Sequence, residues 1–182
     1  MIKKLNILSE EDKILREVSE EVTFPLNETD ANLIDDMLEH LVNSQIEEIA
    51  EKYDLRPGMG LAAIQLGVKK RYFVLAHEQE NKTFNKYVII NPKIISYSNE
   101  RICAGEGEGC LSINRPVDGV VPRYARVTIE YQDKNGNIKR LRAKEELSIA
   151  VQHEIDHLNG VLFIDYIDEN DPYKDEEKMR LI

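Results

Sequence analysis

Hydrophobic residues recur every three or four positions between residues 30 and 53, which is the spacing of one face of an α-helix. The recurring positions are Leu33, Ile34, Met37, Leu38, Leu41, Val42, Ile46 and Ile49. Asp30 is a residue type that commonly caps a helix, and Arg56-Pro57-Gly58 ends the pattern. The sequence therefore predicts a long N-terminal helix from Asp30 to about Tyr53, with its apolar face packed on the core.

The middle of the chain is rich in β-branched and aromatic residues, which favour strands. We expect strands over residues 71–76, 86–90 and 93–97, with Asn91-Pro92 separating the last two. Residues 127–132 and 138–142 alternate apolar and polar positions on either side of Asn135-Gly136, which is a strong signal for a hairpin turn. These patterns predict a mostly antiparallel sheet.

A second helix is predicted over residues 144–158, and Gly160 is well placed to end it. The heavily charged segment 168–182 is expected to be flexible or to form a short C-terminal helix. The order of helix, strands and helix predicts an α+β fold with a mostly antiparallel sheet. Because 182 residues suffice for one well-cored domain and are few for two, we expect a single domain over residues 1–182.

The charge balance excludes some classes of partner. The chain has 34 acidic and 24 basic residues and a net charge of -10, which repels nucleic-acid phosphates. A charged fraction of 32% and the lack of a long apolar run predict a soluble protein. The first residues, Met1 to Asn6, include two lysines but precede no apolar stretch, so we expect no signal peptide. We therefore expect a cytoplasmic protein that binds neither nucleic acid nor a membrane.

The second predicted helix carries a pattern typical of metal-dependent hydrolases, His153-Glu154-Ile155-Asp156-His157. Residues four apart lie on one helix face, so His153 and His157 can bind one cation, with Glu154 beside it to transfer protons. The alternative is two surface histidines on an amphipathic helix. Apolar neighbours oppose that alternative, because a buried imidazole without a partner is costly. These neighbours are Ile149, Ala150, Ile155, Leu158, Val161 and Leu162.

The sequence after this motif does not supply an obvious third ligand. One large class of zinc proteases continues to a glycine and a third histidine; Gly160 matches the glycine, but Phe163 stands at the histidine's position. A second class takes a glutamate from a following helix, and the segment after Ile167 lacks a convincing apolar helical face. His40 and His77 belong to no motif and are expected at the surface.

Cys110 is then the natural candidate for the third ligand. It lies in the glycine-rich run Gly105–Ser112, where backbone can pass close to a bound group. One thiolate and two imidazoles leave a fourth position open for water, as a catalytic metal site requires. The run Gly58–Gln65 has a similar character and offers the side-chain amide of Gln65, but it equally suits a closely packed helix N-terminus.

Three segments together resemble the peptide deformylase family: Gly58–Gln65, Glu108–Ser112 and Gln152–His157. Their order and spacing also agree with that family, and the long first helix looks like the longer type 2 bacterial form. The resemblance implies antiparallel sheets packed around a central metal-binding helix. Ile64 stands where a proline or threonine is more common, which leaves Gln65 in register.

The resemblance implies a ligand set and an activity. Cys110, His153 and His157 would hold one divalent metal ion, usually Fe²⁺, which zinc, nickel or cobalt can replace. Glu154 would be the catalytic acid and base. The reaction would remove the N-formyl group from the N-terminal formyl-methionine of newly synthesised proteins and release formate. The expected partners are therefore nascent N-formylmethionyl chains, met at the ribosome, and we expect a monomer.

The mechanism expected from this resemblance places negative charge on the formyl oxygen. The metal would lower the pKa of its bound water, and Glu154 would take a proton as the water attacks. The side-chain amide of Gln65 and the backbone N–H of Leu111 would stabilise the oxyanion.

The substrate is expected to bind along the same helix face. Ile149 and Ala150 lie four and three residues before His153, so they line an apolar pocket for the methionine side chain or simply belong to the core. Met59, Gly60 and Gly109 are expected to bind the peptide, the first two through their backbone with the peptide extended.

We also expect Arg123 to pair with Asp156. Metal-bound histidines usually donate their second ring N–H to a carboxylate or carbonyl, and a buried Asp156 needs a compensating charge. The alternative is a surface position for both residues.

Two other functions share part of this pattern. A metallopeptidase has the same two-histidine helix, and it would cleave internal peptide bonds instead of releasing formate. A metal or redox sensor would use Cys110 and the two histidines without catalysis, and it would not depend on Glu154.

Overall fold

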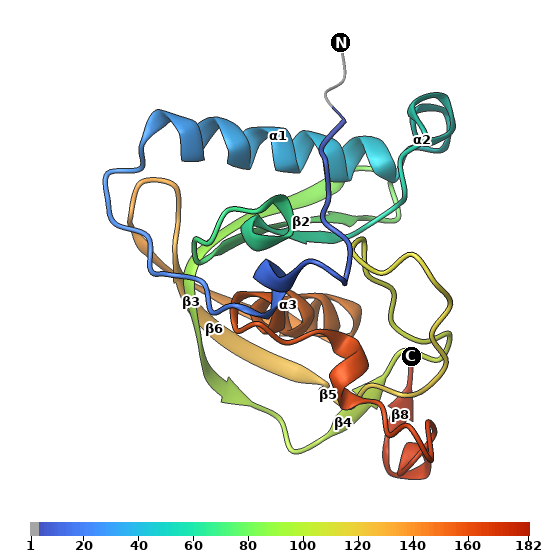
Figure 1. The fold of residues 1–182 in the computed structure, drawn as a ribbon. Coiled ribbons are helices and arrows are strands. Elements are labelled where there is room, and N and C mark those ends of the chain that lie inside the picture. Colours follow the sequence, from blue (N-terminus) through green and yellow to red (C-terminus); the bar gives the residue numbers. More distant parts are fainter. Residues whose placement is uncertain (1–3) are drawn as a thin grey trace.

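The computed structural model describes residues 4–182, so residues 1–3, part of the stretch considered for a signal peptide, lie outside the described residues. A β-sheet curves around one central helix, and a long helix lies on the opposite face of the sheet (Figure 1). The central helix is α3, Glu145–Leu158, and the long one is α1, Glu28–Ser44. Within residues 4–182, no helix is long and apolar enough to cross a membrane.

The main sheet has five antiparallel strands in the order β1-β2-β3-β6-β7. They are β1 Gly60–Ala62, β2 Tyr72–Glu78, β3 Phe84–Tyr97, β6 Arg126–Gln132 and β7 Ile138–Lys144. A smaller sheet has the order β5-β4-β8, with β4 Arg101–Cys103, β5 Arg123–Tyr124 and β8 Arg180–Leu181. The described residues also include four short 3-10 helices: Lys13–Arg16, Ala63–Leu66, Phe163–Tyr166 and Glu176–Lys178. The α+β fold with mostly antiparallel sheets matches the expectation.

Strand β2 is buried on both faces and joins two hydrophobic cores. Phe73 and Leu75 pack in the core that contains the apolar face of α3. The intervening Tyr72, Val74 and Ala76 pack in the core that contains the apolar face of α1. Because successive side chains of a strand point to opposite faces, one strand fixes the position of both helices.

The long helix predicted over residues 30–53 is divided into two. Asn27, and not Asp30, is the N-cap, since its side chain accepts a hydrogen bond from the Asp30 N–H. Helix α1 ends at Ser44, and α2 spans Glu47–Tyr53. The amide of Gln45 donates to the carbonyls of Gly58 and Ala76, which lie outside the helix. These tertiary contacts override the continuous helical pattern of the sequence.

The two strands predicted on either side of Asn91-Pro92 are one strand, β3. The register shifts between Ile90 and Lys93, so the dipeptide forms an irregularity within the strand and does not end it. Asn91 has a φ of 51°, a conformation that asparagine tolerates better than most residues. Its side chain also bonds to the backbone of Val22 and to Gln132.

The segment 168–182 is more ordered than predicted. The expected short helix is present only as the 3-10 turn Glu176–Lys178. Beyond it, β8 pairs in parallel with β4, which the charge pattern of this segment did not indicate.

The expectation of a surface position for His40 is wrong, because only 4% of this residue is exposed. It lies three residues after the buried Met37 and four before the buried Ser44, and so on the same helix face. His77, at the end of β2, is partly buried, with 25% of its side chain exposed.

The N-terminal segment connects parts of the chain that are far apart in sequence. The backbone N–H of Leu8 donates to the carbonyl of Gln65, and that of Glu10 donates to the carbonyl of Ser112. Further along, the N–H of Ser19 donates to the carbonyl of Leu158 at the end of α3. The segment thus touches each of the three glycine-rich or histidine-bearing regions identified in the sequence.

Gly160 ends α3 as predicted. Its N–H donates to the carbonyl of His157, and the N–H of Val161 donates to that of Asp156, which is the Schellman pattern. The φ of Gly160 is 73°, and a Cβ there would lie 2.5 Å from the carbonyl oxygen of Arg16.

We predict that Gly160→Ala destabilises the protein more than Gly67→Ala does. Both glycines have positive φ, but a Cβ at Gly67 would meet nothing closer than a leucine side chain at 3.8 Å. Gly67→Ala should cost about 1 kcal/mol for the left-handed conformation alone. Gly160→Ala should cost about 2 kcal/mol more, since backbone must move. Urea unfolding of both variants measures the difference; equal midpoints would contradict this account.

Candidate metal centre

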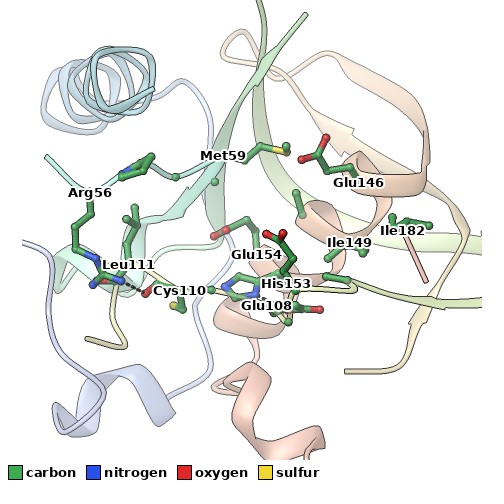
Figure 2. A pocket seen from close by; sticks show the side chains of 18 of the residues that line it. Arg56, Met59, Glu108, Cys110, Leu111, Glu146, Ile149, His153, Glu154 and Ile182 are labelled. Atoms are coloured by element: carbon green, nitrogen blue, oxygen red, sulfur yellow. Dashed lines mark hydrogen bonds and ion pairs between the residues drawn. The ribbon is translucent and has the colours of Figure 1, made fainter. Parts of the chain in front are cut away.

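A cavity of about 750 Å³ opens between β1, α3 and the loop that follows β4 (Figure 2). It brings together the three segments identified in the sequence. The predicted site residues that line it are Met59, Gly60, Gln65, Gly109, Cys110, Leu111, Ile149, Ala150, His153 and Glu154. The remaining one, His157, lies directly behind Cys110, with its Nε2 3.3 Å from the Cys110 Sγ.

Cys110, His153 and His157 converge at one end of this cavity. All three potential ligand atoms lie within 4.8 Å of one another. Helix α3 supplies the two imidazoles from adjacent turns, and the loop after β4 supplies the thiol. The imidazole rings meet edge to face, with centroids 4.9 Å apart.

The donor set and its surroundings suit a divalent cation. Thiolate and imidazole are the ligands that zinc and iron accept in proteins. Burial lowers the pKa of His157, helped by the charge of His153, so its ring is neutral and keeps a lone pair. Burial also acts to lower the pKa of His153, but hydrogen bonds to Cys110 and Glu108 outweigh it and raise the pKa. The environment therefore favours positive charge beside the thiol.

Glu108 orients the first of these histidines. Its Oε2 lies 2.9 Å from the Nδ1 of His153, which leaves the Nε2 of that ring to face the thiol. Arg123 in turn holds both oxygens of Glu108, at 2.6 and 2.9 Å. Burial alone would raise the pKa of Glu108, but the hydrogen bonds from Arg123 and His153 lower it to about 2. The carboxylate is therefore charged and fixed in place.

The predicted pair of Arg123 and Asp156 is confirmed. The Nη1 of Arg123 lies 2.6 Å from the Oδ2 of Asp156, and Tyr166 donates to the other oxygen of Asp156 at 3.0 Å. Only 2% of the Arg123 side chain is exposed. The prediction missed Glu108, the second carboxylate on Arg123. Its position between two glycines, two residues before Cys110, was the available signal.

Glu154 lies on the cavity wall between the histidines and β1. It is 3% exposed, and its Oε2 accepts no hydrogen bond from any described residue. Burial raises its pKa to about 7. A Cβ on Gly60 would overlap the Glu154 carboxylate, so only glycine at that position leaves room for it. The glycine of β1 and the glutamate of α3 are thus sterically coupled.

Gln65 lies in the 3-10 helix after β1 and is held at both ends of its amide. Its Oε1 accepts from the Ala62 N–H at 2.9 Å. Its Nε2 donates to the Ser112 hydroxyl at 3.1 Å and lies 3.7 Å from the Cys110 sulfur. The amide N–H group is therefore directed to the end of the cavity where Cys110, His153 and His157 converge. The segment Gly58–Gln65 is a strand followed by this 3-10 helix, and not the start of an α-helix.

Leu111 follows the thiol and lines the cavity opposite α3 (Figure 2). The guanidinium of Arg56 donates to the carbonyls of Cys110, Leu111 and Ile113. Arg56 therefore fixes the backbone of the loop on either side of Leu111. Its contribution was not predicted from the sequence, because backbone carbonyl partners leave no trace in side-chain patterns.

Several known proteins resemble this chain. The sequence profile of the family described as polypeptide deformylase matches residues 4–173. A peptide deformylase of Listeria monocytogenes serotype 4a is 50% identical over 92% of this chain and 91% of its own length. The crystal structure of an Ehrlichia chaffeensis peptide deformylase is 34% identical, with a TM-score of 0.74 over 92% of this chain and 90% of that one.

A third similar structure holds a peptide. It is a class I type b peptide deformylase from Acinetobacter baumannii, described as Met-Ala-Ser bound. It is 26% identical, with a TM-score of 0.72, and the match covers 92% of this chain and 100% of that one.

We predict that Glu108→Gln weakens metal binding without unfolding the protein. Glutamine keeps the size of the side chain but removes the charge that holds the His153 ring, a change that typically costs 10–100-fold in metal affinity. Competition with a chelator of known affinity measures the loss. Glu106→Gln is the matched control, because Glu106 is an exposed acid on the same loop. Equal affinities in both variants would contradict the assigned role of Glu108.

Proposed function

Because this chain belongs to the polypeptide deformylase family, we propose how its own residues perform that family's reaction. The protein is a metallohydrolase that removes the N-formyl group from newly synthesised peptides. The observation that carries the proposed residue roles is the convergence of one thiol, two imidazoles and a buried carboxyl at one end of a single cavity.

Cys110, His153 and His157 are the proposed metal ligands, and Fe²⁺ is the proposed ion. Their mixed sulfur and nitrogen donor set suits iron as well as zinc, nickel or cobalt, which we expect to be able to replace it. Three protein ligands leave a coordination position free, as in catalytic sites. Such a cation, when bound, lowers the pKa of a water molecule and polarises a carbonyl group.

Glu154 is the proposed proton carrier. Its unpartnered Oε2 is free to accept a proton from the water that attacks the formyl carbon. It then gives that proton to the amine that leaves as formate is formed. A pKa of about 7 suits a group that must both take and return a proton near neutral pH. Burial supplies this pKa, and a bound cation would lower it.

Gln65 and Leu111 are the proposed oxyanion donors. The hydrogen bond from Ala62 fixes the carbonyl end of the Gln65 amide, so its N–H group stays aimed at the metal end of the cavity. Arg56 holds the loop carbonyls around Leu111, which keeps the Leu111 N–H in a fixed place. Fixed donors stabilise developing charge without reorganisation.

The formylated peptide is proposed to bind in extended form along β1. Among residues 4–182 this strand is an edge of the main sheet and pairs only with β2. The carbonyl of Met59 accepts from Ala76 of β2, so alternation directs the N–H and C=O of Gly60 away from β2 and toward the cavity. Gly109, across the cavity, offers backbone without a side chain. The Met-Ala-Ser complex of the Acinetobacter protein supports a peptide ligand here.

Ile149 and Ala150 are the proposed wall for the methionine side chain. Both line the cavity one helical turn before the histidine and glutamate of the motif. An apolar wall at this distance from the reacting carbon suits an unbranched thioether side chain.

The remaining proposals concern setting and assembly. Nascent chains are the substrate, so we propose that the protein works in the cytoplasm, close to the ribosome. We propose that it acts as a monomer and a single catalytic domain, because residues of one chain supply all the groups named above.

We predict that Glu154→Gln keeps the metal and loses turnover. A lost general acid and base typically lowers kcat by about 10²–10⁴-fold. Formate release from a formyl-methionyl peptide measures activity, and elemental analysis measures the metal. Glu48→Gln, on the exposed surface of α2, is the matched control and should match the unmodified enzyme.

The same assay separates the two alternative functions. Internal cleavage of an unformylated peptide, without formate release from the formylated one, would identify a metallopeptidase. Metal binding without formate release, unchanged between the unmodified protein and Glu154→Gln, would identify a sensor.

We predict that protein purified without oxygen contains Fe²⁺ and loses activity in air. Both the ferrous ion and its thiolate ligand are open to oxidation at a site that water can reach. Exchange for zinc or nickel should give an enzyme whose activity survives air. Anaerobic purification, metal analysis and formate release before and after exposure test this. Zinc in the anaerobic protein, with full activity that air does not change, would overturn the assignment of iron.

A further inference from the structure

The segment that ends in β8 forms part of the cavity wall. β8 pairs in parallel with β4, with Ile102 opposite Arg180 and Cys103 opposite Leu181. The pairing continues beyond both strands, because the N–H of Ile182 donates to the carbonyl of Cys103 and the N–H of Gly105 donates to the carbonyl of Ile182. This ladder brings Ile182 to the point where the cavity loop begins.

Ile182 lines the cavity on the side of Ile149 (Figure 2). Ala104 and Gly105 line the same part of it. Ile182 is 40% exposed, so its side chain has one face toward the cavity and another toward solvent. It is an apolar side chain in a segment that is otherwise heavily charged.

The spacing of cavity-lining residues along α3 shows how far this part of the cavity lies from His153. Glu145, Ile149 and His153 follow one another at intervals of four residues, and each lines the cavity. Four residues of α-helix span about 6 Å, so Ile149 lies about one turn from the metal ligand His153. In the view of Figure 2, Ile182 lies on the side of Ile149 that is away from His153 and Cys110. The backbone connects the two residues, because Ala104 packs against the cluster of Ile149 and the next residue, Gly105, donates to the carbonyl of Ile182. It therefore lies beyond the place proposed for the methionine side chain.

Arg180 anchors this segment to α3. Its guanidinium makes a two-pronged contact with Glu145, at 2.7 and 2.8 Å, and a third contact with Glu100 at 2.9 Å. Glu145 is the first residue of α3 and has a φ of 54°, so the contact also holds a residue in an uncommon conformation. A bidentate arginine fixes direction as well as distance. The position of Ile182 is thus tied to the helix that carries Ile149.

We propose that Ile182, positioned by Arg180, closes the far end of the pocket for the first side chain of the substrate and limits its length. The inference rests on the proposed function, because it assumes that the methionine side chain lies along Ile149. It makes Ile182 a specificity-determining residue and Arg180 a positioning residue. The metal end of the cavity is not involved.

The test compares formyl-peptides that differ only in the length of the first side chain. Ile182→Ala should lengthen the pocket. The ratio of kcat/KM for an unbranched side chain two carbons longer than methionine to that for methionine should rise about tenfold, the lower end of what a hydrophobic pocket discriminates per methylene. The change should appear in KM more than in kcat.

Ile182→Phe tests the opposite direction. A larger side chain shortens the pocket, so the same ratio should fall and a shorter first side chain should be favoured. Leu181→Ala is the matched control, since Leu181 is an exposed neighbour that does not line the cavity. It should leave the ratio unchanged.

Arg180→Met tests the anchor. It keeps an unbranched chain and removes three charged hydrogen bonds, so Ile182 is no longer held and the ratio should rise as in Ile182→Ala. In the double variant Arg180→Met with Ile182→Ala, the ratio of kcat/KM values should be no higher than in Ile182→Ala alone. Salt should raise the ratio of the unmodified enzyme, because it screens exposed ion pairs, and should leave that of Arg180→Met unchanged.

The outcomes separate this inference from the proposed function. If the unmodified enzyme releases no formate from any formyl-peptide, the proposed function fails. If it releases formate but the ratio is the same in the unmodified enzyme, Ile182→Ala and Ile182→Phe, only the role of Ile182 fails. Circular dichroism of each variant shows that a changed ratio does not come from unfolding.

Discussion

The site depends on the two ion pairs that the buried guanidinium of Arg123 makes with Glu108 and Asp156. The guanidinium joins Glu108, on the loop that carries the thiol, to Asp156, on the helix that carries the imidazoles. A buried charge is costly unless it is paired, and removing one member of such a group typically costs about 3–5 kcal/mol. Here two carboxylates share one cation, and Glu108 keeps its charge because of it. The loop and the helix therefore hold their positions relative to each other even before a metal binds.

The sheet supplies the second constraint on the same site. β2 packs against both helices, and β1 pairs with β2, so the backbone of Gly60 is placed by the same core that places α3. Glu154 fits against that backbone only because Gly60 lacks a side chain. The contact between Gly60 and Glu154 therefore links the packing of the sheet to the position of the proposed proton carrier.

Patterns over a few neighbouring residues predict the secondary structure and helix faces that those same residues form. The interval between His153 and His157 specifies a helix face, and Phe163 at the position of a third histidine points to a ligand elsewhere in the chain. The break of the first helix at Gln45 depends on carbonyls of Gly58 and Ala76, which helical periodicity does not contain. Glu108 was not assigned either, because its one local signal, a place between two glycines near Cys110, does not tell that its side chain points inward. The wall formed by Ile182 required β8, whose partner strand lies far away in the sequence.

The contacts of the N-terminal segment affect how fast the site forms as well as where its residues lie. Leu8, Glu10 and Ser19 reach the regions of Gln65, Ser112 and Leu158, so closing these contacts requires long loops to form. Contacts between distant residues slow folding, because loop entropy must be overcome before they contribute stability. While the chain is being synthesised, the thiol-bearing loop exists well before the helix that completes the ligand set. An enzyme proposed to act on emerging chains therefore cannot assemble its own centre until its chain has emerged beyond His157.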